Sequence, residues 1–352
     1  MEETILSIDG LKTYFFTEAG IVKAVDGISF DLKRGESLGL VGESGSGKTV
    51  TALSVLRIIP KPGKIVEGKV MFNSENLIDK TEKEMQKLRG KDVAIIFQDP
   101  SSSLNPVYTV EEQLSDVIKA HEKKELEKLH PWQFLRKRRQ MLLSKKEIRM
   151  KIINLLEVVG IPDAETRMRE YPHQFSGGMK QRVAIARALA CEPALLFADE
   201  PTTNLDVTIQ AQMLLLLDEL KKKLGMSLVM ITHDMGIVAK MTSRVVVLYA
   251  GNVYEIARTY DLFEHPMHPY TEALLAAVPR LDMRKTLELI PGNIPNLIEP
   301  PSGCRFHPRC KYATKQCEKS APVLVKVGPE HFVACHEWKN ITLKGEKTNI
   351  DK

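Results

Sequence analysis

The chain has 352 residues, 43% of them hydrophobic, which is enough for a large core and an accessory domain. Its 50 basic and 45 acidic residues leave a net charge of only +5, so the charge does not argue for nucleic acid as a partner. No stretch approaches the roughly 20 apolar residues of a membrane-spanning helix, the N-terminus lacks the features of a signal peptide, and attachment to a membrane is therefore expected to depend on partner proteins.

Two kinds of strand are predicted along the chain. Segments at 5–8, 21–32 and 66–72 predict an antiparallel subdomain. Largely apolar runs are typical of strands that are buried on both faces in a parallel core. Such runs lie at 37–41, 93–97, 194–198, 228–232 and 244–249.

The run at 37–41 leads directly into the sequence GESGSGKT. A GxxxxGK[ST] loop after a strand turns backbone N–H groups around a phosphate chain at a helix N-terminus. In such a loop Lys48 bridges the β- and γ-phosphates, and the Thr49 hydroxyl holds Mg²⁺. An ordinary glycine-rich turn is the alternative, and the preceding strand argues against it. The predicted phosphate loop is Gly42, Glu43, Ser44, Gly45, Ser46, Gly47, Lys48 and Thr49.

A helical region is predicted after the strand at 93–97 and the glutamine that follows it, Gln98. It extends from about 99 to 172 and includes a strongly charged part, residues 119–151, with Arg136-Lys-Arg-Arg139. We interpret the charged part as a solvated helix face, with contact to anionic lipid headgroups as the alternative.

The sequence FSGGM at 175–179, called the signature below, precedes a helical stretch at 180–190. Ser176, Gly177 and Gly178 would place N–H groups at the start of that helix, as a second anion cradle. Because the chain already has a complete phosphate loop, the second cradle predicts a nucleotide bound at an interface between subunits. A plain serine N-cap is the alternative.

Polar side chains follow two of the apolar runs. Asp199 and Glu200 come after the run at 194–198, and His233 follows the run at 228–232. Ligands of open α/β sheets bind at the carboxyl ends of the strands. There Asp199 would reach Mg²⁺, and Glu200 would polarise the attacking water. His233 would contact the γ-phosphate, with a structural role as the alternative.

Four of the five cysteines lie in a proline-rich tail, after a predicted helix near 259–278. Since disulfides are disfavoured in the cytosol, clustered thiols in a segment with little core suggest a metal centre. The spacing C-x5-C-x6-C-x17-C matches neither common zinc knuckles nor bacterial ferredoxins, so it does not identify the metal. The four are Cys304, Cys310, Cys317 and Cys335, with His307, His331 and His336 as substitute ligands, whereas Cys191 is predicted to be a core residue.

Residues 5–340 resemble the ATP-binding subunit of an oligopeptide/dipeptide ABC importer, a group that includes nickel importers, and are most similar to its D-type ATPase. Three stretches carry this resemblance: 42–60 (GESGSGKTVTALSVLRIIP), 98–106 (QDPSSSLNP) and 303–310 (GCRFHPRC). Met179 stands where many ABC proteins have glutamine, and Asn204 where alanine is commoner. Neither departure removes a phosphate ligand or the catalytic carboxylate.

The resemblance implies a P-loop ABC ATPase core with an antiparallel β subdomain and a helical subdomain (1–257), followed by a small cysteine-rich domain (258–352). It implies that Gln98 joins Thr49 and Asp199 around Mg²⁺, and that Lys48, Gln98, Glu200 and His233 take part in hydrolysis. It also implies that Phe15 stacks on adenine. Tyr14 and Phe16 are alternatives, and edge-strand packing is the simpler role for all three. The tail cysteines resemble iron–sulfur sites, which favours a [4Fe–4S] cluster, with zinc or free thiols as alternatives.

The implied partners are a paralogous ATPase, two transmembrane permease subunits and an external substrate-binding protein, at the cytoplasmic face of the membrane. In such importers two ATPases form a head-to-tail dimer, and each ATP lies between one phosphate loop and the partner's signature. A soluble, non-transport ABC ATPase is the alternative. The span between phosphate loop and signature has no room for the long coiled coils of repair ATPases, and translation-type proteins carry two cassettes.

Overall fold

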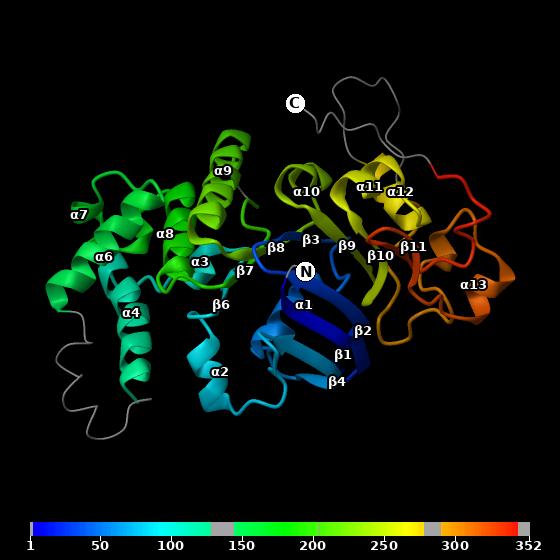
Figure 1. Cartoon of the computed structure of the whole chain (residues 1–352), viewed down its shortest axis with the longest axis horizontal. Helices are drawn as coiled ribbons and strands as arrows, with labels where there is room; N and C mark the ends of the chain where they lie inside the picture. The colour runs from blue at the N-terminus through cyan, green and yellow to red at the C-terminus, as the bar shows by residue number, and fades with distance from the viewer. Residues whose placement is uncertain (1–2, 128–143, 204, 278–289, 344–352) are drawn as a thin grey trace. The chain divides into compact units, whose positions relative to one another are not determined.

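The computed structural model describes residues 3–127, 144–203, 205–277 and 290–343 (Figure 1). By their internal contacts the residues divide into two compact units, Met1–Lys80 with Val229–Lys352, and Thr81–Leu228. Across the described ranges, no helix is both long and apolar enough to cross a membrane.

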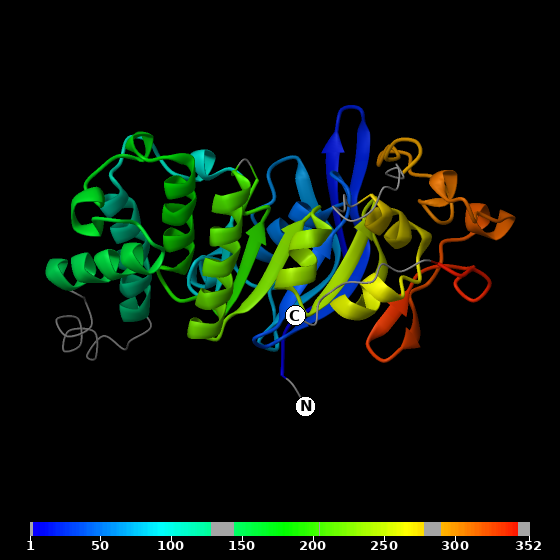
Figure 2. The ribbon, with the colours of Figure 1, turned by 90° about the horizontal axis from the view of Figure 1, so that it is seen from above.

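The first unit contains the predicted antiparallel sheet, whose strand order is β2-β1-β4-β5. Its two longest strands form a hairpin, drawn in blue in Figure 2. Along the second of them Ile28, Phe30 and Leu32 are buried, whereas the residues between them are partly exposed. This alternation is typical of a sheet with one face on a core. The strands are β1 (Thr4–Thr17), β2 (Gly20–Lys33), β4 (Gly63–Phe72) and β5 (Glu75–Asn76).

A second sheet of the first unit has the strand order β11-β12-β10-β9-β3-β8. In three of these strands, β3, β8 and β9, every residue is buried, which confirms three of the apolar runs as core strands. β3 and β9 pair in parallel. The strands are β3 (Ser37–Val41), β8 (Ser227–Thr232), β9 (Arg244–Tyr249), β10 (Asn252–Arg258), β11 (Val325–Gly328) and β12 (His331–Val333).

The helix predicted near 259–278 is in fact two helices. Pro266 cannot donate a backbone hydrogen bond, and a proline disfavours helical backbone in the residue before it. The second helix begins at Pro269, and the His268 side chain accepts a hydrogen bond from the Tyr270 N–H there. The helices of this unit are α1 (Lys48–Leu56), α10 (Met235–Met241), α11 (Thr259–Glu264), α12 (Pro269–Ala276), α13 (Lys315–Lys319) and the 3₁₀ turn η2 (His307–Arg309).

The cysteine-bearing segment shares its core with the second sheet. Cys304, Phe306 and Cys317 are buried in the same hydrophobic cluster as Val41 and Tyr249. β12 also pairs with β10 at the edge of the sheet. The segment therefore lacks a core of its own, and the prediction of a separate cysteine-rich domain is not supported. The predicted domain boundaries themselves stay predictions.

The second unit combines two parallel strands, β6 (Val93–Ile96) and β7 (Leu195–Asp199), with helices. Helices predominate among the described residues from 99 to 127 and from 144 to 172, in agreement with the prediction, whereas Arg136-Lys-Arg-Arg139 lies outside the described residues. The signature helix starts at Gly177, three residues earlier than predicted. The helices are α2 (Glu82–Leu88), α3 (Pro100–Ser103), α4 (Val110–Glu127), α6 (Lys145–Val158), α7 (Ala164–Arg167), η1 (Pro172–Gln174), α8 (Gly177–Leu189) and α9 (Val207–Leu224).

Candidate functional site

The phosphate loop of the first unit lies tightly against neighbouring backbone. A Cβ atom on Gly42 would lie 2.0 Å from the Leu248 carbonyl oxygen, and one on Gly47 would lie 2.5 Å from the carbonyl oxygen of Ala24. Both glycines also have positive φ angles, 150° and 104°, and residues with a side chain rarely adopt such angles. Gly47 is the N-cap of α1, and no side chain caps this helix. The first turn therefore directs backbone N–H groups toward an anion site.

Lys48 is folded back into the loop. Its Nζ donates to the carbonyl oxygens of Gly42 at 2.7 Å and Glu43 at 2.9 Å, and only 6% of the residue is exposed. The ammonium group is thus held at the centre of the loop, where a phosphate group would compete with these carbonyl oxygens for it. Thr49, the next residue, is exposed.

The structure distinguishes among the three adjacent aromatic residues of β1. The Tyr14 hydroxyl donates to the Asp26 carboxylate at 2.5 Å, and Phe16 is 43% exposed beneath the Lys64 ammonium. Phe15 is half-buried and packs against Gly63. Of the three, Phe15 has neither a polar partner nor a cation over its ring among the described contacts. Its predicted stacking on adenine stays a prediction.

His233 follows β8 directly and is exposed. Its backbone leads into Asp234, whose carboxylate caps α10 by accepting from Gly236 and Ile237. The strand end and the helix cap together fix where His233 emerges from the sheet of the first unit. The γ-phosphate contact predicted for it is not tested by this geometry.

In the second unit the structure brings Gln98 and Glu200 together. Gln98 follows β6, Glu200 follows β7, and the Gln98 Nε2 donates to the Glu200 Oε2 at 2.7 Å. The Thr203 hydroxyl donates to the same oxygen at 3.1 Å. Glu200 has a φ of 43°, a left-handed backbone that is uncommon for a side-chain-bearing residue and typical of functional sites. Asp199, at the end of β7, is only 4% exposed.

The signature serine caps its helix. Ser176 is the N-cap of α8, and its hydroxyl accepts from the Met179 N–H at 3.3 Å. Gly177 has open space where a Cβ would lie, and a Cβ on Gly178 would lie 3.1 Å from the Ile209 side chain. The N-cap that was the alternative interpretation is therefore present, and the predicted role of the signature in binding a partner's nucleotide stays a prediction.

The structure groups the predicted nucleotide residues into two sets. The first unit holds the phosphate loop, Phe15 and His233, and the second holds Gln98, the signature, Asp199 and Glu200. Two residues that hold the loop in place were not predicted from the sequence. Tyr270 of α12 accepts a hydrogen bond from the Glu43 N–H at 2.8 Å, and Arg309 forms an ion pair with the Glu43 carboxylate. Arg309 lies in the stretch GCRFHPRC, but nothing in that stretch or around Tyr270 indicates a contact with the loop, because both residues are remote from it in sequence.

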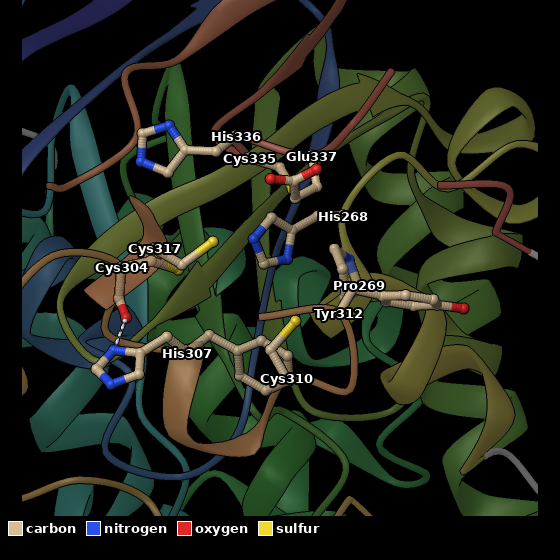
Figure 3. Close-up of a pocket in the computed structure, with 11 residues that line it drawn as sticks. His268, Pro269, Cys304, His307, Cys310, Tyr312, Cys317, Cys335, His336 and Glu337 are labelled. Atoms are coloured by element: carbon tan, nitrogen blue, oxygen red, sulfur yellow. Dashed lines mark hydrogen bonds between the residues drawn. The ribbon is translucent and has the colours of Figure 1, made fainter. Parts of the chain in front are cut away.

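The four tail cysteines line one pocket, together with His268, His307 and His336 (Figure 3). His331, predicted as a substitute ligand, instead pairs with the buried Glu255 carboxylate at 2.7 Å. Cys191 belongs to the second unit and is partly buried.

The cysteine thiols influence one another electrostatically. Burial, and then the charges of the neighbouring cysteines, raise the pKa of Cys310 to about 11 and that of Cys335 to about 12. Burial also raises the pKa of the Cys304 thiol. Within the described ranges, however, no three or more His, Cys, Asp or Glu side chains are arranged to hold a metal ion.

Comparisons with known families match both halves of the chain. Residues 25–203 match the ABC transporter family, and residues 254–317 match the family described as the oligopeptide/dipeptide transporter C-terminal region.

Several relatives align along nearly the whole chain. The dipeptide transport ATP-binding protein DppD of Bacillus subtilis is 44% identical over 335 residues, 95% of this chain and 94% of that protein. The DppD protein of Escherichia coli is 44% identical over 333 residues, 94% of this chain and 96% of its own length.

Solved structures of ATP-binding cassettes share the fold. The dimeric cassette MJ0796, bound to ADP and phosphate in a post-hydrolysis state, superposes with a TM-score of 0.60 at 25% identity and covers 72% of this chain and 98% of its own. The protein cbiO1 of Clostridium perfringens, part of the complex cbiONQ, superposes with a TM-score of 0.57 at 29% identity and covers 74% of this chain and 91% of its own.

Proposed function

The chain belongs to the ABC transporter family, among its peptide-transport ATP-binding proteins, and we propose that it is the subunit that powers peptide import by hydrolysing ATP. The observation that carries this proposal is the phosphate loop with its buried lysine, in a chain whose C-terminal region also matches the oligopeptide/dipeptide transporter family. As an ABC ATPase the chain hydrolyses ATP. The proposal concerns the cargo, which we take to be a peptide.

For the chemistry, Lys48 exchanges its loop carbonyl partners for the β- and γ-phosphates when ATP enters the loop. Thr49, Gln98 and Asp199 would hold Mg²⁺, because hydroxyl, amide and carboxylate oxygens are the ligands that this hard cation prefers. Bound Mg²⁺ would neutralise charge on the phosphates. Glu200, positioned by Gln98 and Thr203, polarises the attacking water.

For the assembly, the signature of this chain would complete the ATP site of a paralogous ATPase, whose own signature completes the site here. Two permease subunits would anchor the pair at the cytoplasmic face of the membrane, and an external binding protein would deliver the peptide. The names of the relatives and the dimeric cassette support this arrangement.

The test is to purify the chain with its permeases, partner ATPase and binding protein in lipid vesicles, and to measure ATP turnover with candidate cargoes. Di- or oligopeptides should stimulate turnover and Ni²⁺ should not. Stimulation by Ni²⁺ alone would make it a nickel importer. A purified chain that is already a tight, fully active dimer without its paralogue would contradict the heteromeric arrangement.

For the tail, we infer a [4Fe–4S] cluster held by Cys304, Cys310, Cys317 and Cys335. The chemistry of the donor set fits, since four cysteine thiolates are the usual ligands of such a cluster. The four cysteines line one pocket, although no three of the described His, Cys, Asp or Glu side chains are arranged to hold a metal ion. Anaerobically purified protein should contain iron and acid-labile sulfide in equal amounts, whereas stoichiometric zinc without sulfide would contradict the inference.

A further inference from the structure

The segment that carries the cysteines reaches the phosphate loop through a buried arginine. Arg309 directs two N–H groups at the Glu43 carboxylate, with Nη1 2.6 Å from Oε2 and Nη2 3.0 Å from Oε1. The side chain of Arg309 is 6% exposed and that of Glu43 is 24% exposed. Such a two-bond pair, largely out of water, fixes both distance and orientation. It joins residues 266 positions apart in the sequence.

Arg309 is itself held in place by the segment and by the sheet. Its Nε donates to the Pro291 carbonyl oxygen at 2.7 Å, and its Nη1 also lies 3.2 Å from the Tyr249 hydroxyl. The guanidinium carbon lies 5.7 Å from the centre of the Tyr249 ring. That ring packs against Tyr270, with ring centres 4.7 Å apart, and Tyr270 accepts from the Glu43 N–H. The side chain and the backbone of Glu43 are thus both held from outside the loop.

A second arginine of the same segment holds the other end of the loop. Arg305 donates to the Ala250 carbonyl oxygen and pairs with the Asp26 carboxylate. The next residue, Gly251, donates its N–H to the Ser46 carbonyl oxygen at 3.0 Å. The segment therefore contacts the phosphate loop directly at Glu43, and through this turn at Ser46.

Glu43 is a carboxylate inside a loop that must accept the negative charge of a phosphate chain. Unpaired, it would repel the phosphates in a site where partial burial weakens screening. Paired with Arg309, its charge is neutralised locally and its side chain is held aside. The pair thus has an electrostatic effect on ATP binding that packing alone would not have.

We propose that Arg309 is a positioning residue for ATP binding, which neutralises Glu43 and fastens the phosphate loop to the C-terminal segment. This inference rests on the proposed ATPase function and adds that the C-terminal segment sets the affinity of the loop for ATP. A structural change in the C-terminal segment would therefore alter the affinity for ATP through Arg309.

The test is a double-mutant cycle in the full chain, with the Kd for MgATP measured by titration calorimetry. Arg309→Gln should raise the Kd about tenfold, because it leaves a charged group without its partner. The double variant Glu43→Gln, Arg309→Gln should return the Kd to within about threefold of wild type, since coupled residues give non-additive effects. If Arg309→Gln only destabilised the C-terminal segment, adding Glu43→Gln in the loop would not restore the Kd for MgATP.

Lys311→Gln is the matched control. Lys311 lies two residues further on and pairs with Glu272 at 3.0 Å rather than with the loop, so its Kd should not change. An unchanged Kd in Arg309→Gln, an equal loss in Lys311→Gln, or no rescue by Glu43→Gln would overturn the inference. In those cases the proposed ATPase function would still stand, provided that the wild-type chain binds ATP. A wild-type chain that does not bind ATP would overturn both the inference and the proposed function.

Discussion

Replacing Glu200 by glutamine should leave ATP binding intact and suppress hydrolysis. The Glu200 Oε2 accepts hydrogen bonds from the Gln98 amide at 2.7 Å and the Thr203 hydroxyl at 3.1 Å. A glutamine amide oxygen can accept both, so the side chain should keep its place and lose only its charge. Loss of a group that polarises the attacking water costs about 10²- to 10⁴-fold in rate, which corresponds to about 2.7–5.4 kcal/mol in the activation barrier.

The assay is steady-state ATP turnover of the assembled transporter, with bound nucleotide identified after rapid separation. The Glu200→Gln transporter should retain ATP rather than ADP. Thr203→Val is the control, because it removes one hydrogen bond to Glu200 and keeps the charge, and it should lower turnover by about tenfold or less. Turnover of Glu200→Gln within tenfold of wild type would refute the assigned role, as would loss of ATP binding.

Three further outcomes are expected. Lys48→Ala should raise the Kd for ATP at least about tenfold in calorimetry, because a charged donor to the phosphates is lost, and an unchanged Kd would contradict its role. Burial lowers the pKa of His268 to about 3, below its unfolded value of about 6.5, so the folded state loses stability as the pH falls below 6.5. Between pH 6.5 and 5 the free energy of unfolding should fall by up to about 2 kcal/mol in urea titrations. His268→Asn, which keeps an acceptor for the Tyr270 N–H, should remove that dependence; an unchanged pH slope would contradict the assignment. The double variant Cys310→Ser, Cys317→Ser should lose iron and sulfide together and bind ATP more weakly, and full retention of either property would count against the tail assignments.

The ATP-binding motifs could be predicted from the sequence because each is a local pattern. An apolar run before GESGSGKT specifies a buried strand, a glycine turn and a helix start within a few residues. The structure has this arrangement at β3, Gly42 and α1. The antiparallel strands and the helical region were predicted for the same reason, since a period of two or of 3.6 residues is visible in the sequence itself.

Other features of the structure depend on single residues, and the periodic pattern of the sequence does not show the effect of such a residue. The apolar pattern at 259–278 continues across Pro266, so it predicted one helix where the structure has two. The sequence alone did not show which of Tyr14, Phe15 and Phe16 stacks on adenine, because the three aromatic residues are adjacent. The structure separates Tyr14 from the other two, since its hydroxyl donates to the Asp26 carboxylate. The cargo and the metal are not specified by any of these local patterns.

By itself the sequence determined the family, the phosphate loop, the strand-end carboxylates and the set of cysteines, because residue type and spacing are sufficient for each. Only the tertiary structure decided that the cysteine segment shares a core with the second sheet and that Arg309 pairs with Glu43. Those contacts join side chains hundreds of residues apart. These contacts form because the folded sheet brings the two segments together. The sequence of either segment alone does not show which residues the other will place beside it.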